Sequence, residues 1–318
     1  MTPTTQEEVM QLCGWVPNRA EQEKFIELNN YEWERDVPQL YGSAAEVKDA
    51  FMWEAEEAIL KSLLPAHAQK IGSCVSHGWG RGAQDLMLCE IWFHKESESF
   101  PGQVATEPIY AGSRVEIGRG RIGNKDGSLG SWAADWVSKY GIVIRGKYGN
   151  VDLSFNDENL AKRWGAPNAG VPDDLESLAK EHPVKTVALV TTTQGAADAL
   201  ANYYPIPICS NQGFSMVRDA NGICRGEGQW AHCMLVRGVC ILKGGKRIFI
   251  IQQSWGESPT GPNVLKLESG KEVTMPQGCF GCEEQVMAKI LGARDSFAIS
   301  GFVGFKKRRK HDSWRPVA

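Results

Sequence analysis

The amino-acid sequence predicts an α+β protein with two lobes. Apolar residues recur at helical spacing through the first half of the 318 residues, whereas β-branched runs dominate the part after residue 183. Two of these runs flank a Gly-Gly pair, which is the pattern of a β-hairpin. Helices first and antiparallel strands later are typical of α+β architecture. With 42% hydrophobic residues, the chain has enough apolar side chains for both lobes.

The sequence predicts that residues 1–64 form an acidic helical extension. Residues 5–13 and 19–34 are rich in Glu, Gln and Leu, which favours helices. Residues 43–64 begin with a Ser-x-x-Glu capping pattern and place apolar residues four apart. This spacing predicts one amphipathic helix that ends at Pro65. Residues 1–66 hold 13 acidic and 5 basic side chains, a balance of −8 (5 − 13).

Residues 65–182 predict a helical lobe. The segment 75–91 mixes apolar with small residues, which suits a buried helix. A loop rich in Gly and Arg over 112–130 leads to a second helical period over 131–137, which stops at Tyr140-Gly141.

Residues 183–305 predict a lobe rich in β-strands. The apolar runs 233–239 and 247–253 flank Lys243-Gly244-Gly245-Lys246 and predict an antiparallel hairpin. The shorter elements that we expect are a strand over 184–190, a helix over 194–203 and the start of a strand at 205–208.

Composition excludes several classes of protein. No stretch approaches the roughly 18 apolar residues of a membrane span, and the mean hydropathy is −0.32. The segment 1–20 lacks a basic start followed by an apolar run, so we expect no secretory signal and a cytoplasmic protein. The nine cysteines are odd in number and irregularly spaced, which indicates free thiols in a reducing compartment.

The charge is unevenly distributed along the chain. A tail over 306–318 holds six basic residues and one acidic residue, while 67–305 is close to neutral. No broad basic face is expected, so nucleic acid is not an expected partner except through the tail. The sequence also allows contact of the tail with a membrane surface or with the acidic 1–64 segment.

Three short segments carry the candidate chemistry. Cys74 follows Gly72-Ser73 at the predicted start of a helix, where unpaired N–H groups and the helix dipole stabilise a thiolate. His232 lies at the mouth of the first hairpin strand, and Gln253-Ser254-Trp255-Gly256 leaves the end of the second. Because these strands pair, His232 and Gln253 are expected to come close, so that the amide orients the imidazole while Trp255 shields their hydrogen bond from water.

These segments, in this order, resemble the papain-like cysteine peptidases, and the likeness to a divergent intracellular member covers roughly residues 67–305. The resemblance implies a helical lobe that carries the nucleophile and an antiparallel, β-barrel-like lobe that carries the histidine. It further implies a triad of Cys74, His232 and Gln253. A substrate-binding cleft is implied at Asp126, Gly127, Ser128 and Trp255.

Two positions depart from the pattern of the family. Gln253 stands where the family has Asn, and the family's oxyanion-hole Gln, six residues before the nucleophile, is replaced by Ala68. Gln69, one residue later, is therefore the candidate oxyanion donor. The departures leave open a catalytically degenerate scaffold used for binding or assembly, and an amidase that keeps the thiol chemistry on another substrate.

The expected function is a thiol hydrolase that cleaves a peptide or related amide bond through a Cys-His-Gln triad and an acyl-enzyme, with a peptide or protein as substrate. No metal or organic cofactor is implied. The single CxxC at 279–282 lacks the further ligands that zinc needs, and the glycines of 118–123 mimic a dinucleotide fingerprint without a preceding strand. His77 lies on the same face of the predicted helix as Cys74. It is either a partner in the chemistry or a polar group at the edge of the cleft.

Overall fold

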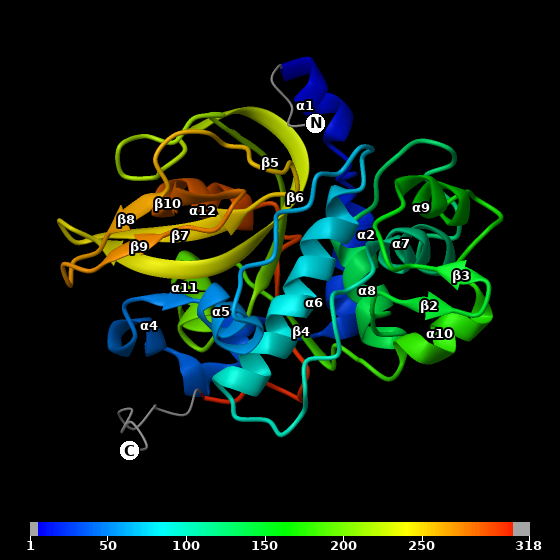
Figure 1. Cartoon of the computed structure of the whole chain (residues 1–318), viewed down its shortest axis with the longest axis horizontal. Coiled ribbons are helices and arrows are strands. Elements are labelled where there is room, and N and C mark those ends of the chain that lie inside the picture. The colour runs from blue at the N-terminus through cyan, green and yellow to red at the C-terminus, as the bar shows by residue number, and fades with distance from the viewer. Residues whose placement is uncertain (1–5, 308–318) are drawn as a thin grey trace.

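The computed structural model describes residues 6–307, and the expectations for the basic tail beyond residue 307 lie outside these residues. Figure 1 shows an antiparallel sheet on one side, a group of helices on the other, and helix α6 (Cys74–Trp92) between them. The predicted α+β architecture with two lobes is therefore confirmed. None of the described helices has the length and apolarity to cross a membrane.

The first half of the chain is mainly helical, as the spacing predicts. Its helices before α6 are α1 (Gln6–Leu12), α2 (Arg19–Asn29), α3 (Trp33–Asp36), η1 (Pro38–Leu40), α4 (Ser43–Glu46) and α5 (Trp53–Leu60). After α6 come α7 (Thr106–Gly112), the π-helical turn η2 (Ser113–Ile117), α8 (Gly130–Lys139), α9 (Glu158–Trp164) and α10 (Asp173–Ala179). A small hairpin, β2 (Lys147–Tyr148) with β3 (Val151–Asp152), separates α8 from α9.

The second half builds the sheet. Its strands are β4 (Thr186–Leu189), β5 (Ile206–Phe214), β6 (Gly226–Leu242), β7 (Lys246–Gln252), β8 (Val264–Lys266), β9 (Glu272–Thr274), β10 (Cys279–Glu283) and β11 (Phe297–Ser300), and its helices are α11 (Thr193–Ala201) and α12 (Glu284–Leu291). The long strand β6 pairs with β5 and with β7, and β10 pairs with β7, all antiparallel. The hairpin around Gly244-Gly245 is thus confirmed. Backbone hydrogen bonds from Cys224 N–H to Gly281 O (3.0 Å) and from Gly281 N–H to Gly222 O (2.8 Å) also join the chain just before β6 to β10, at the other edge of the sheet.

The single helix predicted over 43–64 is wrong. Two short helices, α4 and α5, occupy this segment, and between them Ala50 and Phe51 form strand β1, which pairs with Val239 and Gly238 of β6. The edge of β6 offers unpaired backbone groups to this segment, so sheet hydrogen bonding overrides the helical periodicity.

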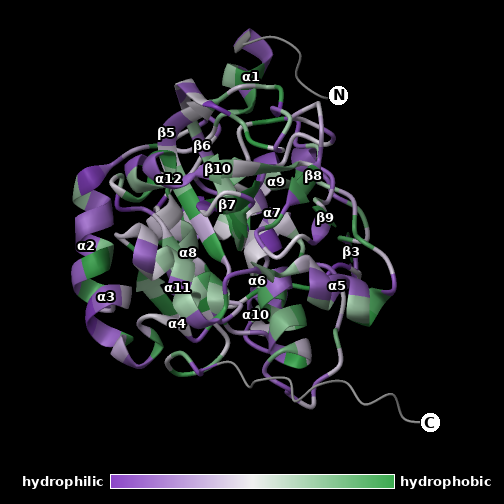
Figure 2. Cartoon of the chain, turned by 90° about the vertical axis from the view of Figure 1, so that its left-hand side faces the viewer, coloured by the Kyte–Doolittle hydropathy of each residue, from purple (hydrophilic) through white to green (hydrophobic). Residues whose placement is uncertain are grey.

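The core lies between α6 and the sheet, where α6 packs against β6. Trp79 and Trp136 are fully buried in the main apolar cluster. Figure 2 shows hydrophobic stretches on the interior elements α8, α11 and β7, and hydrophilic stretches on the outer helices α2 and α3.

A buried ion-pair network joins α5 to the core. Glu56 accepts from Arg81 (2.5 Å) and from Arg237 (2.8 Å), and Asp85 accepts from Arg237 (2.9 Å). All four side chains are at least nine-tenths buried. The two carboxylates balance the two guanidinium groups, which is what allows four charges inside a protein. Glu56 belongs to the 1–64 segment, and it pairs with Arg81 and Arg237 of the predicted 65–305 domain. The division of the chain into these two parts stays a prediction.

Candidate active site

Cys74 is the first residue of α6, where the sequence places a nucleophile. Its Sγ accepts hydrogen bonds from the backbone N–H groups of Gly14 (3.3 Å) and Cys233 (3.4 Å). The side chain is fully buried, and this burial raises the pKa of the thiol well above its usual value, although both N–H groups act in the opposite direction. In this state the thiol is therefore held neutral and away from water.

His232 precedes Cys233, whose backbone N–H contacts the thiol, on strand β6. Its ring is fully buried and stacks on Trp255, with 4.4 Å between the ring centroids. Burial, together with the nearby His77, lowers the pKa of His232 to about 3, so the imidazole is neutral at pH 7. Neither ring nitrogen has a hydrogen-bond partner among the described residues. The imidazole therefore makes no hydrogen bond to the thiol, although a catalytic pair would make one.

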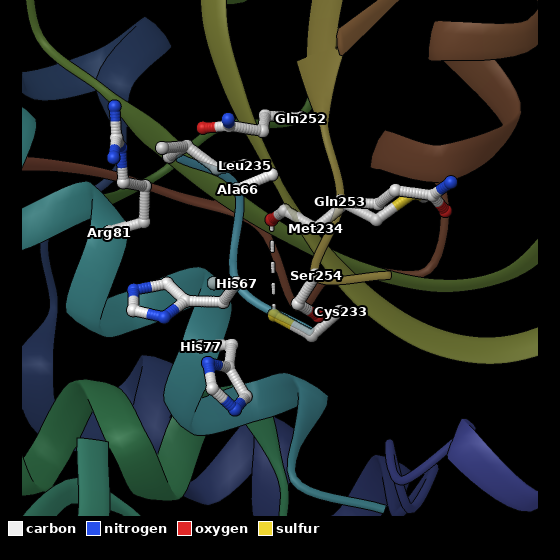
Figure 3. Close-up of a pocket in the computed structure, with 11 residues that line it drawn as sticks. Ala66, His67, His77, Arg81, Cys233, Met234, Leu235, Gln252, Gln253 and Ser254 are labelled. Atoms are coloured by element: carbon white, nitrogen blue, oxygen red, sulfur yellow. Dashed lines mark hydrogen bonds between the residues drawn. The ribbon is translucent and has the colours of Figure 1, made fainter. Parts of the chain in front are cut away.

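Gln253, at the end of β7, does not bond to His232 in this structure. Its Nε2 donates to the carbonyl oxygen of Ser258 (3.0 Å), and its Oε1 is buried with no partner in the described chain. Figure 3 shows the Gln253 side chain pointing away from His67 and His77. The oxygen that the orienting role requires is consequently free to accept a hydrogen bond, and the role itself stays a prediction.

The Gln69 side chain binds two backbone carbonyl groups. Its side-chain Nε2 donates to the carbonyl oxygens of Leu12 (2.7 Å) and Ile71 (2.8 Å), and its Oε1 accepts from the Ser254 hydroxyl. The backbone N–H of Gln69 also donates to Ser254 O (2.9 Å), which ties this segment to the strand end that carries Trp255. Gln69 therefore presents an amide N–H of the kind that an oxyanion hole uses.

The loop that the resemblance assigns to the cleft pairs with the protein's own backbone. Ser128 N–H donates to Gly14 O (2.8 Å), and Val16 N–H donates to Ser128 O (2.9 Å). Gly127 has φ +110°, and a Cβ there would lie 2.5 Å from Gly14 O. Only glycine therefore permits this close approach. Asp126 forms an ion pair with Lys162 (3.4 Å).

Residues 12–16, which we call the covering segment, lie across the candidate site. Besides the contacts above, Trp15 N–H donates to Ala231 O (2.9 Å), the residue before His232. A Cβ on Gly14 would lie only 1.8 Å from Gly72 O, so the segment fits tightly against the start of α6. The covering segment thus contacts both lobes and buries Cys74. The sequence did not single out residues 12–16 of the 1–64 segment for this place, because no local pattern there encodes a contact with a distant part of the chain.

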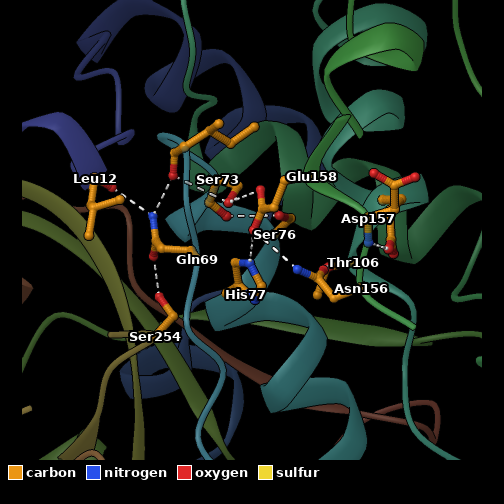
Figure 4. Close-up of polar contacts among 12 residues, drawn as sticks. Leu12, Gln69, Ser73, Ser76, His77, Thr106, Asn156, Asp157, Glu158 and Ser254 are labelled. Carbon is orange, nitrogen blue, oxygen red and sulfur yellow. Dashed lines mark hydrogen bonds and ion pairs between the residues drawn. The ribbon is translucent and has the colours of Figure 1, made fainter. Parts of the chain in front are cut away.

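A second polar cluster supports the first turn of α6 (Figure 4). Glu158, the first residue of α9, accepts from Ser73 Oγ (2.8 Å) and lies 2.9 Å from His77 Nε2. Burial opposes ionisation of Glu158 and would raise its pKa, but the hydrogen bonds with His77, Ser73 and Asn156 and the charge of His77 together lower the pKa of the carboxyl. The cluster fixes the residue that precedes the candidate nucleophile. The sequence singled out His77 but gave no indication of Glu158.

The hollow behind the site is small. Figure 3 shows it between α6 and the ends of β6 and β7, lined by residues that include His67, His77 and Cys233. Its volume of about 20 Å³ leaves room for a single water molecule. Among residues 6–307 no group of three or more His, Cys, Asp or Glu side chains is arranged to hold a metal ion.

Comparison with known proteins identifies the fold. No protein-family model matches the chain, and no curated protein matches it by sequence. Solved structures do match: xylellain, a cysteine protease from Xylella fastidiosa, has 14% identity and a TM-score of 0.58, over 94% of this chain and 99% of that one. Procathepsin B S9 from Trypanosoma congolense has 10% identity and a TM-score of 0.53, over 96% and 90% of the two chains. The proform of the ragweed cysteine protease Amb a 11 has 12% identity and a TM-score of 0.51, over 93% and 77%.

The chain therefore has a papain-like fold, as the resemblance in the sequence implies. Identities of 10–14% establish the fold alone, so the chemistry is argued from the residues of this chain.

Proposed function

We propose that this protein is a thiol hydrolase that cleaves a peptide or related amide bond, with Cys74 as nucleophile and His232 as general base. The observation that carries the proposal is the surroundings of Cys74. The thiol lies at the N-terminus of a 19-residue helix, beside the strand residue that follows His232, and the Gln69 side chain binds the carbonyl of Leu12 in the covering segment, whose Gly14 contacts the thiol. A nucleophile, a base and a carbonyl-binding donor are the parts that acyl transfer requires.

The reaction proceeds in two halves. His232 takes the thiol proton as Cys74 Sγ attacks the carbonyl carbon, and the oxygen that becomes negative accepts from the Cys74 N–H and from Gln69 Nε2. The C–N bond then breaks, and the proton on His232 passes to the leaving amine. Water, deprotonated by His232, attacks the thioester and restores the thiol, and the acid product leaves.

The covering segment makes the described state a closed one. Its Gly14 N–H contacts the thiol that a substrate carbonyl must reach, and both thiol and imidazole are buried and neutral. The Amb a 11 structure, to which this chain is similar, is described as a proform. A closed state of this protein agrees with that likeness. Hydrolysis therefore requires displacement of residues 12–16.

The alternative is a papain-like scaffold without catalysis. The free Oε1 of Gln253 and the two unpartnered nitrogens of His232 favour it, because an assembled triad would pair them. Peptide hydrolysis by a Gly14→Ala variant, in which the added Cβ collides with Gly72 O, separates the two functions. We expect hydrolysis that Cys74→Ala abolishes and that Cys89→Ala, a buried cysteine on the same helix, leaves unchanged. No hydrolysis by the Gly14→Ala chain would favour the scaffold.

Gln253 provides a graded test of the triad. We expect Gln253→Asn to keep hydrolysis and Gln253→Ala to lower it roughly tenfold, because one orienting hydrogen bond is worth at least about 1.4 kcal/mol in the transition state. The measurement is kcat/KM in the Gly14→Ala background, with thermal unfolding as the control for the fold. If the Gln253→Ala chain is as active as the chain that keeps Gln253, then Gln253 is not part of the triad.

A further inference from the structure

A carboxylate is clamped where the helical extension meets the candidate cleft. Glu21, in the first turn of α2, accepts two hydrogen bonds from Arg121, at Nη1 (2.5 Å) and Nη2 (2.8 Å). The indole Nε1 of Trp132, on α8, donates a third (3.1 Å). The hydrogen bond from Arg121 is the main cause that lowers the pKa of Glu21 to about 2. A forked guanidinium with an added N–H donor is a strong and directional way to bind a carboxylate.

The clamp is held in place by residues other than Glu21. Arg121 Nε donates to Gly118 O (2.9 Å), and the guanidinium lies over the ring of Trp132 at 4.9 Å from its centroid. Trp132 itself is 5% exposed. The two terminal nitrogens of Arg121 therefore keep their direction whether or not α2 supplies the carboxylate.

The charges around the clamp favour an acidic ligand. The hollow that contains Glu21 has a volume of about 370 Å³. Its charged lining residues are Glu21, Lys24, Glu116, Arg119, Arg121, Asp135 and Lys139. When α2 leaves, Lys24 leaves with Glu21, and three basic residues then face two acidic ones, a balance of +1 (3 − 2).

The clamp adjoins the path of the covering segment. Arg121 and Trp132 also line a second hollow of about 240 Å³, whose other walls include Val16, Asp126 and Leu129. Val16 is the residue whose N–H donates to Ser128 O. A peptide that replaces residues 14–16 on Ser128 and continues past the position of Val16 would therefore run alongside the clamp.

We propose that Arg121 and Trp132 form a subsite for an acidic side chain, Asp or Glu, of the substrate, and that Glu21 occupies this subsite in the closed state. The inference rests on the proposed function and names the substrate class, a peptide with a carboxylate on the side of the cleft formed by α8. Release of α2 leaves the guanidinium and the indole N–H without their acceptor, and the substrate carboxylate replaces it.

A binding experiment on the full chain tests the subsite without catalysis. The probe is N-acetylglutamate N-methylamide, its glutamine analogue is the control ligand, and the signal is the indole N–H resonance of Trp132, assigned by its loss in Trp132→Phe. In Glu21→Ala, which empties the clamp, we expect a saturable shift with the glutamate compound alone. We expect no shift in the parent or in Glu23→Gln, which removes an exposed carboxylate of the same helix that pairs with Arg19. Absence of a shift in Glu21→Ala, or an equal shift with the glutamine compound, would overturn the subsite.

A hydrolysis experiment separates this inference from the proposed function. In the Gly14→Ala/Glu21→Ala chain, we expect peptides with Glu at one position to be cleaved at least tenfold faster than their Gln counterparts, and Arg121→Met to reduce this ratio to about one. Cleavage without a preference for Glu would overturn the subsite and leave the hydrolase intact. Binding of the glutamate compound without cleavage of any peptide would overturn the hydrolase and leave the carboxylate site intact.

Discussion

Replacement of Gly14 by alanine is expected to raise the rate of peptide hydrolysis at least about tenfold over the parent chain. The new Cβ would lie 1.8 Å from Gly72 O, and a backbone carbonyl at the start of α6 cannot yield by that much. The covering segment must then move away and expose Cys74 to water. Exposure brings the thiol pKa back toward its usual value, and each unit of this fall increases the thiolate population about tenfold at neutral pH.

Gly146→Ala is the matched control for this prediction. Gly146 also lies outside the positive-φ region, and a Cβ there meets nothing closer than 3.6 Å, so the substitution tests the general effect of Gly to Ala. We expect the Gly146→Ala chain to behave like the parent. An unchanged rate for Gly14→Ala, with the fold intact by circular dichroism, would show that the covering segment does not limit access to Cys74.

Replacement of Glu56 by alanine is expected to lower the free energy of unfolding by about 3–5 kcal/mol. Glu56 is fully buried; burial alone would raise its pKa, but Arg81 and Arg237 outweigh it and lower the pKa of the carboxyl. Removal of this carboxylate leaves two buried guanidinium groups with Asp85 as their one remaining carboxylate partner in the network. The uncompensated charge, rather than the lost hydrogen bonds, accounts for most of the cost.

Urea unfolding at neutral pH measures this effect. The control is Glu57→Ala, because Glu57 is the next residue of α5 and is exposed. A loss below about 1 kcal/mol for Glu56→Ala, similar to that for Glu57→Ala, would mean that the network does not anchor α5 to the core.

The parts of the fold that the sequence predicts correctly are those in which local pattern and tertiary structure agree. The segment 75–91 has helical spacing and lies within α6, and the two apolar runs around Gly244-Gly245 pair as β6 and β7. The segment 43–64 fails because its helical period conflicts with a partner distant in the sequence: Ala50 and Phe51 bond to β6, which belongs to the other lobe. The periodicity of apolar residues indicates which side chains face an apolar surface. It does not indicate which part of the chain provides that surface.

In the candidate site too, the sequence predicts the residues that belong to short motifs and misses those whose place depends on distant contacts. Cys74, His232 and Trp255 are singled out by short motifs; in the structure Trp255 stacks on His232, and the N–H of the next residue, Cys233, contacts the thiol of Cys74. The covering segment and Glu158 are not found, because their roles depend on contacts between segments that lie far apart in the sequence. A buried carboxylate on another helix that contacts the first turn of α6 has no sequence signature of its own.

Mapping of a covalent adduct tests the central claim most directly. The Gly14→Ala chain is treated at neutral pH with a peptide that carries a thiol-directed electrophile, and the modified cysteine is located by mass spectrometry. We predict one major adduct, on Cys74, whose rate of formation falls at least tenfold in the additional variant His232→Ala. An adduct confined to Cys13, the one cysteine of the nine that is not buried, or labelling of Cys74 that His232→Ala leaves unchanged, would contradict a catalytic Cys74–His232 pair.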